Sequence, residues 1–213
     1  TIVDVYPHVR DYLSLWKLGA DGLVIHRTGD WDWTDWGKHK DVPVVENAWL
    51  YLALKAAVEM AQLSGNTADI AGYQASMKSI EANFNKTFWD GKQYRSAAHK
   101  GLTDDRGNAM AVVAGLAKSK YYPAIQQVLK QEYNASPYME KYVLESLFMM
   151  GDADQAVERI LKRFAKMIDA PISTLYENFG GGEDRANHGT INHAWSGGGL
   201  TMMPQYIAGV QPT

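Results

Sequence analysis

Aromatic and acidic side chains alternate in one short stretch of the sequence, GDWDWTDWG, at residues 29–37. Its tryptophans scatter around a helix, and on a strand Trp36 would face away from the other two, so we expect a loop. Indole rings stack on the C–H faces of sugars, and carboxylates accept hydrogen bonds from sugar hydroxyls. The stretch therefore predicts a carbohydrate site; the plainer alternative is a loop that buries its aromatics and caps a helix with aspartate. The candidate binding residues are Asp30, Trp31, Trp33, Asp35 and Trp36.

A second stretch with chemical potential, TLYENFGGGEDRANHGTINHAWSGGG, covers residues 174–199. Glu177 stands among aromatic side chains and ahead of three glycines, which let a backbone approach a ligand closely. A carboxyl group in such surroundings suits general acid or base catalysis, although an acid that caps a helix or forms an ion pair is the alternative. Asn192, His193 and Trp195 follow at the start of the last predicted helix and are further candidates for binding.

Composition excludes several classes of function. The chain has 213 residues, 46% of them apolar and 21% charged, as in an ordinary globular domain. A net charge of −3 gives no electrostatic case for binding nucleic acid or an anionic membrane, and no apolar run is long enough to span a bilayer. The absence of cysteine excludes disulfides and thiolate metal sites, and the six histidines show no zinc-binding spacing. We expect no metal and no cofactor.

The elements that must position the two loops are predicted to be helices. The segments 42–65 and 137–150 are apolar on most faces, whereas 67–88 and 152–168 each carry a single apolar stripe. This alternation is typical of helical hairpins stacked in an inner and an outer layer, as in an α/α toroid or an α-solenoid. Only 91–97 and 171–179 look strand-like. The full set of predicted helices is 3–16, 42–65, 67–88, 105–117, 121–133, 137–150, 152–168 and 193–208.

Four segments in a fixed order resemble bacterial α-L-rhamnosidases, the family 78 glycoside hydrolases of the six-hairpin glycosidase superfamily. They are GDWDWTDWGKHKD (29–41), STLYENF (173–179), INHAWSGGG (191–199) and YIAGVQP (206–212). The resemblance covers nearly the whole chain and implies an all-α fold, a toroid of helical hairpins that forms part of an (α/α)6 barrel. Tyr176 and Asn178 depart from it, because the family commonly has Trp and Arg at these positions.

The resemblance implies a mechanism and a set of roles. Hydrolysis of a terminal α-L-rhamnoside from a plant or microbial glycan would invert the anomeric carbon, with Glu177 as the general base. Asp30 and Asp35 would hold sugar hydroxyls, and the loop tryptophans would form an apolar wall. His193 would bond the sugar near the base, with Asn192 and Trp195 beside it.

The family's general acid is a glutamate in a segment upstream of the tryptophan-rich loop, and this sequence contains no such segment. About eight helices are predicted, whereas a six-hairpin barrel has twelve. We therefore expect residues 1–213 to be a single domain, the C-terminal two-thirds of a catalytic barrel. It should pack against the rest of the barrel or another copy of itself, and be inactive alone. In a complete chain, Asp30 or Asp35 would be the acid instead.

Three other readings remain open. The chain could be a non-catalytic carbohydrate-binding helical module, or a six-hairpin glycosidase that acts on another sugar. A plain α-solenoid scaffold would leave the two loops far apart. A secreted or periplasmic bacterial enzyme is expected, with a cytoplasmic one as the alternative.

Overall fold

The computed structural model describes residues 1–29, 32, 34–172, 174–179 and 189–210. Within them the chain is helical and contains no strand, so the predicted all-α class is confirmed. The eight α-helices are α1 (Ile2–Leu13), α2 (Val42–Leu63), α3 (Ile70–Phe88), α4 (Asp105–Val113), α5 (Tyr122–Gln131), α6 (Pro137–Met149), α7 (Ala153–Ile168) and α8 (Gly198–Met202). None of them is long and apolar enough to cross a membrane.

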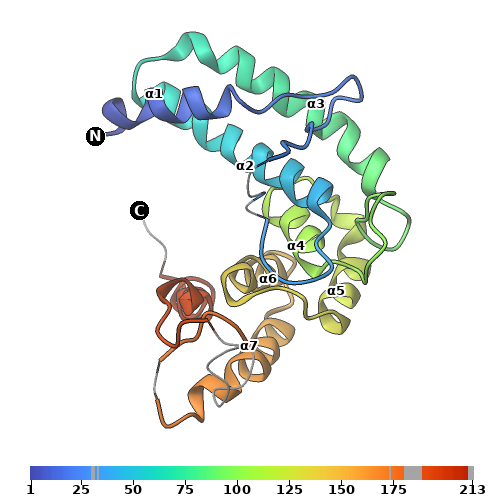
Figure 1. Cartoon of the computed structure of the whole chain (residues 1–213), viewed down its shortest axis with the longest axis vertical. Coiled ribbons are helices and arrows are strands. Elements are labelled where there is room, and N and C mark those ends of the chain that lie inside the picture. Colours follow the sequence, from blue (N-terminus) through green and yellow to red (C-terminus); the bar gives the residue numbers. More distant parts are fainter. Residues whose placement is uncertain (30–31, 33, 173, 180–188, 211–213) are drawn as a thin grey trace.

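The helices form the two layers that the alternating patterns predict. Helices α2, α4, α6 and α8 pack side by side in sequence order, and α3, α5 and α7 each pack outside the inner helix that precedes them. In Figure 1 the hairpins follow an open arc, with α1 at one end and the segment that contains α8 at the other. This arrangement is a partial toroid of helical hairpins.

Helix burial follows the layers. In α4 every residue from Asp105 to Val112 is buried, including two charged ones, whereas the outer helix α3 buries only Ile80, Phe84 and Phe88. A helix that contributes one stripe to the core can keep its remaining faces polar. Helix α4 has no such free face and must satisfy its polar groups internally.

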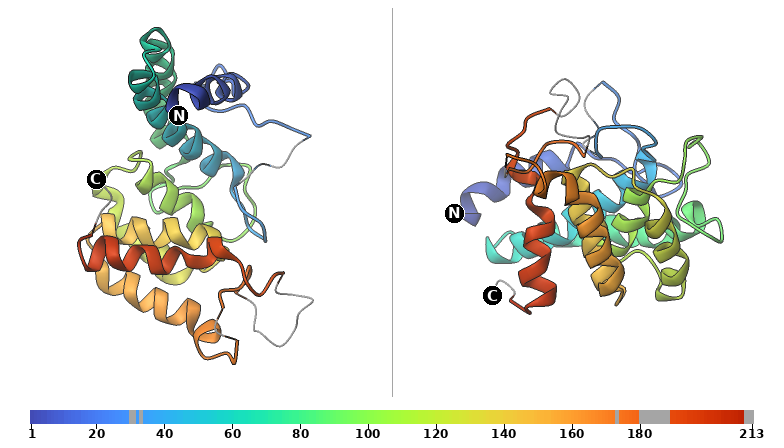
Figure 2. Two further views of the ribbon diagram at one scale, coloured as in Figure 1. Left: turned by 90° about the vertical axis from the view of Figure 1, so that its left-hand side faces the viewer. Right: turned by 90° about the horizontal axis from the view of Figure 1, so that it is seen from below.

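Capping residues draw the N-termini of the inner helices together. The carboxylate of Asp104, the N-cap of α4, accepts the backbone N–H of Arg106 (3.1 Å) and also that of Asp41 (2.7 Å), which precedes α2. Ser136 caps α6 and accepts the N–H of Met139 at 3.3 Å. The loops that lead into the inner helices therefore gather at one end of the molecule, as Figure 2 shows.

Two buried arginines form ion pairs, one between α4 and the tryptophan-rich loop and one between α7 and the inner helices α4 and α6. Arg106 of α4 lies 2.6 Å from Asp104 and 3.1 Å from Asp35 of the tryptophan-rich loop. Arg159 of α7 lies 2.7 Å from Asp105 and 2.6 Å from Glu140 of α6. Buried charges are tolerated when they are paired and hydrogen-bonded, and both guanidinium groups meet that condition.

The predicted helix 193–208 is broken into three parts. A 3₁₀ turn at Ala194–Gly197 leads into α8, and a π-helix at Met203–Ile207 follows. A Cβ at Gly198 would lie 2.6 Å from Cβ of Lys141 on α6, so a glycine is needed for this close packing.

The two strand predictions are wrong in the described residues. Segment 91–97 forms a turn with one isolated bridge between Trp89 and Tyr94, and Asp90 accepts the N–H groups of Lys92 and Gln93. The described residues of 171–179 are irregular. Backbone hydrogen bonds nevertheless pair Glu177 with Thr190 and Leu175 with His193.

Candidate active site

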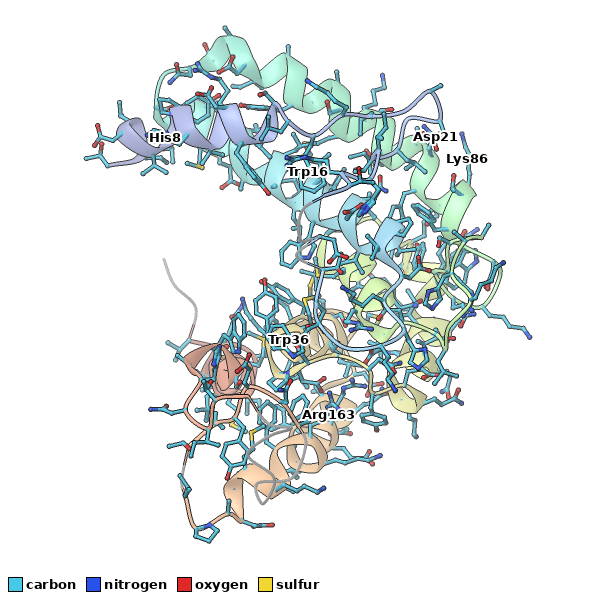
Figure 3. The ribbon with its side chains drawn as sticks, in the orientation of Figure 1. His8, Trp16, Asp21, Trp36, Lys86 and Arg163 are labelled. Atoms are coloured by element: carbon cyan, nitrogen blue, oxygen red, sulfur yellow. The ribbon has the colours of Figure 1, made fainter. Side chains whose placement is uncertain are left out.

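The two loops predicted from the sequence meet on the face of the molecule where the inner helices begin. The indole N–H of Trp36 donates to Oδ1 of Asn178 at 2.7 Å, next to Glu177 in the chain. Trp36, labelled in Figure 3, also packs against Trp195, with 4.6 Å between ring centroids. The prediction that the loops share one region is confirmed, and a scaffold that keeps them apart is excluded.

Three aromatic rings from three elements form what we call the aromatic cluster: Trp36, Tyr138 and Trp195. Tyr138 stacks on Trp36 with centroids 6.4 Å apart and lies 5.4 Å from Trp195. His193 lies 4.2 Å from the Trp195 ring. Burial raises the pKa of Tyr138, which keeps its hydroxyl protonated and able to donate.

Glu177 is held by a short backbone pairing between the two halves of its loop. Its N–H donates to the carbonyl of Thr190, and the N–H of His193 donates to the carbonyl of Leu175, both at 2.9 Å. The N–H of Thr190 returns to Oε2 of Glu177 at 2.8 Å. Oε1 has no hydrogen-bond partner among the described residues, and the side chain is 27% exposed. One carboxylate oxygen is thus fixed, while no residue that the structure describes occupies the other, which could bind a water molecule or a ligand.

Gly189 makes room for this carboxylate. It has a φ of +62°, and a Cβ there would lie 2.2 Å from Oε2 of Glu177. Any other residue would therefore both strain the backbone and displace the carboxylate.

His193 lies beside the carboxylate, with Nδ1 3.8 Å from Oε2 of Glu177 and in hydrogen-bond contact with Oγ1 of Thr190. Nδ1 is thereby engaged with the loop, and Nε2 remains the nitrogen that can reach a ligand. Asn192 is exposed next to it. The predicted residues Glu177, His193, Trp195 and Trp36 therefore form one group.

Asp35 lies apart from this group. Its side chain has no exposed surface, and Oδ2 binds Nη1 of Arg106 (3.1 Å) and the N–H of Ser136 (2.9 Å). These contacts tie the tryptophan-rich loop to α4 and α6, and they leave no surface that could reach a sugar in this structure. Asp30, Trp31 and Trp33, the other predicted binding residues of the loop, lie outside the described residues.

Sequence analysis missed two members of the site, Tyr138 and Thr190. Tyr138 stands in the first turn of α6, two residues after the N-cap Ser136, in the layer that the apolar pattern places inside. A polar or aromatic residue in the first turn of an inner helix is the signal that would have found it.

Comparison with known proteins places the chain in a family. Residues 1–207 match the sequence model of the bacterial alpha-L-rhamnosidase 6 hairpin glycosidase domain. The chain therefore belongs to this family of six-hairpin glycosidase domains. Comparison with curated proteins gives no match.

Two solved structures share the fold. One is a GH78 family rhamnosidase of Bacillus sp. GL1, with a TM-score of 0.78 and 20% identity over 95% of this chain and 23% of that chain. The other is a rhamnosidase from Klebsiella oxytoca with rhamnose bound, with a TM-score of 0.77 and 19% identity over 96% of this chain and 42% of that chain. The chain thus spans less than half the length of either structure.

Proposed function

We propose that the chain carries the general-base half of a glycoside hydrolase that removes terminal α-L-rhamnosyl groups from glycans or glycosides with inversion. Family membership supports the glycosidase class. The single observation that carries the assignment is the Glu177 carboxylate, which has one oxygen fixed by Thr190 and the other without a described partner.

In this mechanism Glu177 acts on water. Oε1 takes a proton from a water molecule as the water oxygen forms a bond to the anomeric carbon, on the face opposite the glycosidic bond. That bond breaks as a second carboxyl group protonates the leaving oxygen. Inverting enzymes hold the two carboxyl groups roughly 6.5–9.5 Å apart so that the water fits between them.

The aromatic cluster is proposed to bind the sugar ring. Trp36 and Trp195 offer π-faces to the C–H bonds and the methyl group of a 6-deoxy sugar. His193 and Asn192 donate to or accept from its hydroxyls. Trp31 and Trp33 are assigned to the same wall, and Asp30 to the sugar hydroxyls, on the strength of the family resemblance alone.

The second carboxyl group is proposed to come from outside these 213 residues. The sequence lacks the segment in which the resemblance places the general acid, and the solved relatives are more than twice as long. The remaining part of a barrel, or another copy of the chain, is the proposed packing partner. Secretion or a periplasmic location is part of the proposal, because extended glycans lie outside the cell.

Hydrolysis of 4-nitrophenyl α-L-rhamnoside by the native polypeptide that carries this sequence tests the proposal. We expect turnover, with β-L-rhamnose as the first anomer seen by NMR. A faster reaction with another 4-nitrophenyl glycoside would change the sugar, and release of α-L-rhamnose first would contradict inversion. Binding of rhamnose without any hydrolysis would contradict the catalytic proposal and favour a carbohydrate-binding module.

A further inference from the structure

Residues 174–179, the segment that carries Glu177, form neither helix nor strand. Contacts with neighbouring elements therefore decide where the carboxylate lies. Just before Glu177, the N–H of Tyr176 donates to Sδ of Met167 on α7 at 3.5 Å. The carbonyl of Tyr176 accepts the hydroxyl of Ser196 at 2.6 Å. One side of Glu177 is thus fixed to α7 and to the turn that leads into α8.

The other side is fixed by Phe179. Beyond Asn178, which Trp36 binds, the ring of Phe179 packs on two side chains of α7. The guanidinium of Arg163 lies over this ring, with 3.7 Å between Cζ and the ring centroid. The ring of Phe164 meets it edge-on, with centroids 5.2 Å apart. A cation is attracted to the face of an aromatic ring, and more strongly where water is excluded. The Arg163 side chain is only 12% exposed, so this contact is an anchor for the segment.

The edge of the same guanidinium holds a second part of the site. Nη1 of Arg163, labelled in Figure 3, donates to the carbonyl of Tyr133 at 3.1 Å, and Nη2 donates to the carbonyl of Ala135. These two residues precede α6, and the first turn of α6 carries Tyr138 of the aromatic cluster. Arg163 therefore joins the segment of Glu177 to the helix that carries part of the aromatic cluster.

Arg163 differs in its partners from Arg159, one turn earlier on α7. Arg159 lies 2.7 Å from Asp105 and 2.6 Å from Glu140, so carboxylates hold it. Among the described residues, the carboxylate contact of Arg163 is with Glu140 alone, at 3.4 Å from Nε. Burial lowers the pKa of Arg163, and Glu140 opposes that change. Arg159 thus serves the ion pairs between helices, whereas Arg163 spends its contacts on loop carbonyls and the Phe179 ring.

We propose that Arg163 is a positioning residue for Glu177, because it holds Phe179 and thereby keeps the carboxylate where it can take a proton from water. The inference rests on the proposed function, since it concerns the step that Glu177 performs. Reacting groups must lie about 3–3.5 Å apart, and a displacement of about 1 Å can cost about 10²-fold in rate.

Steady-state kinetics of the native polypeptide on an aryl α-L-rhamnoside test the inference. Arg163→Met keeps the length of the side chain but removes its charge and donors. Phe179→Leu removes the ring, and Phe179→Tyr keeps it. Lys166→Met, which removes an exposed cation of the same helix, is the control. Each variant is also made together with Glu177→Gln, and circular dichroism establishes that each is folded at the assay temperature.

Arg163→Met and Phe179→Leu should each lower kcat about 10- to 100-fold with KM nearly unchanged. Phe179→Tyr and Lys166→Met should keep most of the activity. In the Glu177→Gln background neither Arg163→Met nor Phe179→Leu should lower kcat further, because residues that act through one group are not additive.

Three results would overturn the inference: an unchanged kcat, a raised KM with normal kcat, or equal losses of kcat with and without Glu177→Gln. The last would show a general effect on the fold. If Arg163→Met does not fold, Phe179→Leu decides the matter, because Phe179 is only partly buried and its loss disturbs the core less.

The proposed function and the inference fail differently. If the native polypeptide hydrolyses no 4-nitrophenyl glycoside, the proposed function is wrong, and crystal structures of Phe179→Leu and Lys166→Met then test the positioning itself. A Glu177 carboxylate that moves by about 1 Å or more in Phe179→Leu alone would support the role of the contact. A carboxylate that stays in place would overturn it.

Discussion

At the scale of single residues, the site depends on one glycine. Gly189 has a positive φ, and its missing side chain leaves room for the Glu177 carboxylate. Gly189→Ala should lower kcat/KM on an aryl α-L-rhamnoside at least about tenfold, because a displaced base loses part of its rate contribution of roughly 10²–10⁴.

The matched control is Gly115→Ala, since Gly115 has a φ of +81° but open space around it. Both variants should lose stability from the strained backbone, by about 1 kcal/mol in a thermal or urea unfolding experiment. Only Gly189→Ala should lose activity. Equal kinetic effects would show that the carboxylate does not depend on this contact.

The sequence predicted which loop residues the structure brings together, but not all of their surroundings. Glu177, His193 and the two tryptophans could be found because each stands in a loop with a distinctive local pattern. Asp35 was expected to face a ligand, whereas it binds Arg106, which lies 71 residues further along the chain. Local sequence has the same appearance whether a loop aspartate faces solvent or a buried arginine.

At the scale of elements, apolar periodicity predicted the existence of every main helix and the layer of four of them, α2, α3, α6 and α7. Their ends were predicted less well, because caps such as Ser136 stop a helix in ways that periodicity does not describe. The last helix was predicted as continuous, yet it breaks around Gly197–Gly199, where α8 packs closely on α6 and α7. That break follows from a tertiary contact and has no periodic signal.

The ion pair between Asp35 and Arg106 should stabilise the arrangement of these elements. Asp35→Ala removes one partner of a fully buried pair and leaves the N–H of Ser136 without an acceptor. We expect a loss of about 3–5 kcal/mol in the free energy of unfolding, measured by urea denaturation. Asp11→Ala, at an exposed pair with Arg10, should leave stability nearly unchanged. A loss for Asp35→Ala as small as that of the control would mean that the loop is held by other contacts.

At the scale of the whole molecule, the two elements that end the arc carry exposed apolar side chains. They belong to α1 and to the segment around α8, and they are Val3, Val5, Tyr12, Leu200 and Ile207. Apolar surface of this kind favours association, because burying it contributes roughly 25 cal/mol per Å². Residues 1–213 produced alone should therefore self-associate.

Sedimentation velocity tests this expectation. The 213-residue chain should sediment as a species larger than its monomer mass of 23.7 kDa, and Val5→Ser together with Ile207→Ser should shift it toward the monomer. Lys55→Ser, at an exposed charged position on α2, is the control and should change nothing. A stable monomer of the unaltered chain would show that the exposed edges need no partner.

The central claim is that Glu177 is the general base, and the kinetics of Glu177→Gln in the native polypeptide test it most directly. The amide keeps the shape of the side chain and its contact with Thr190 but cannot take a proton from water. The claim predicts that kcat on an aryl α-L-rhamnoside falls about 10²–10⁴-fold with KM nearly unchanged, while Glu158→Gln, exposed on α7, retains full activity. A Glu177→Gln variant with nearly normal kcat and a raised KM would contradict it and make Glu177 a binding residue.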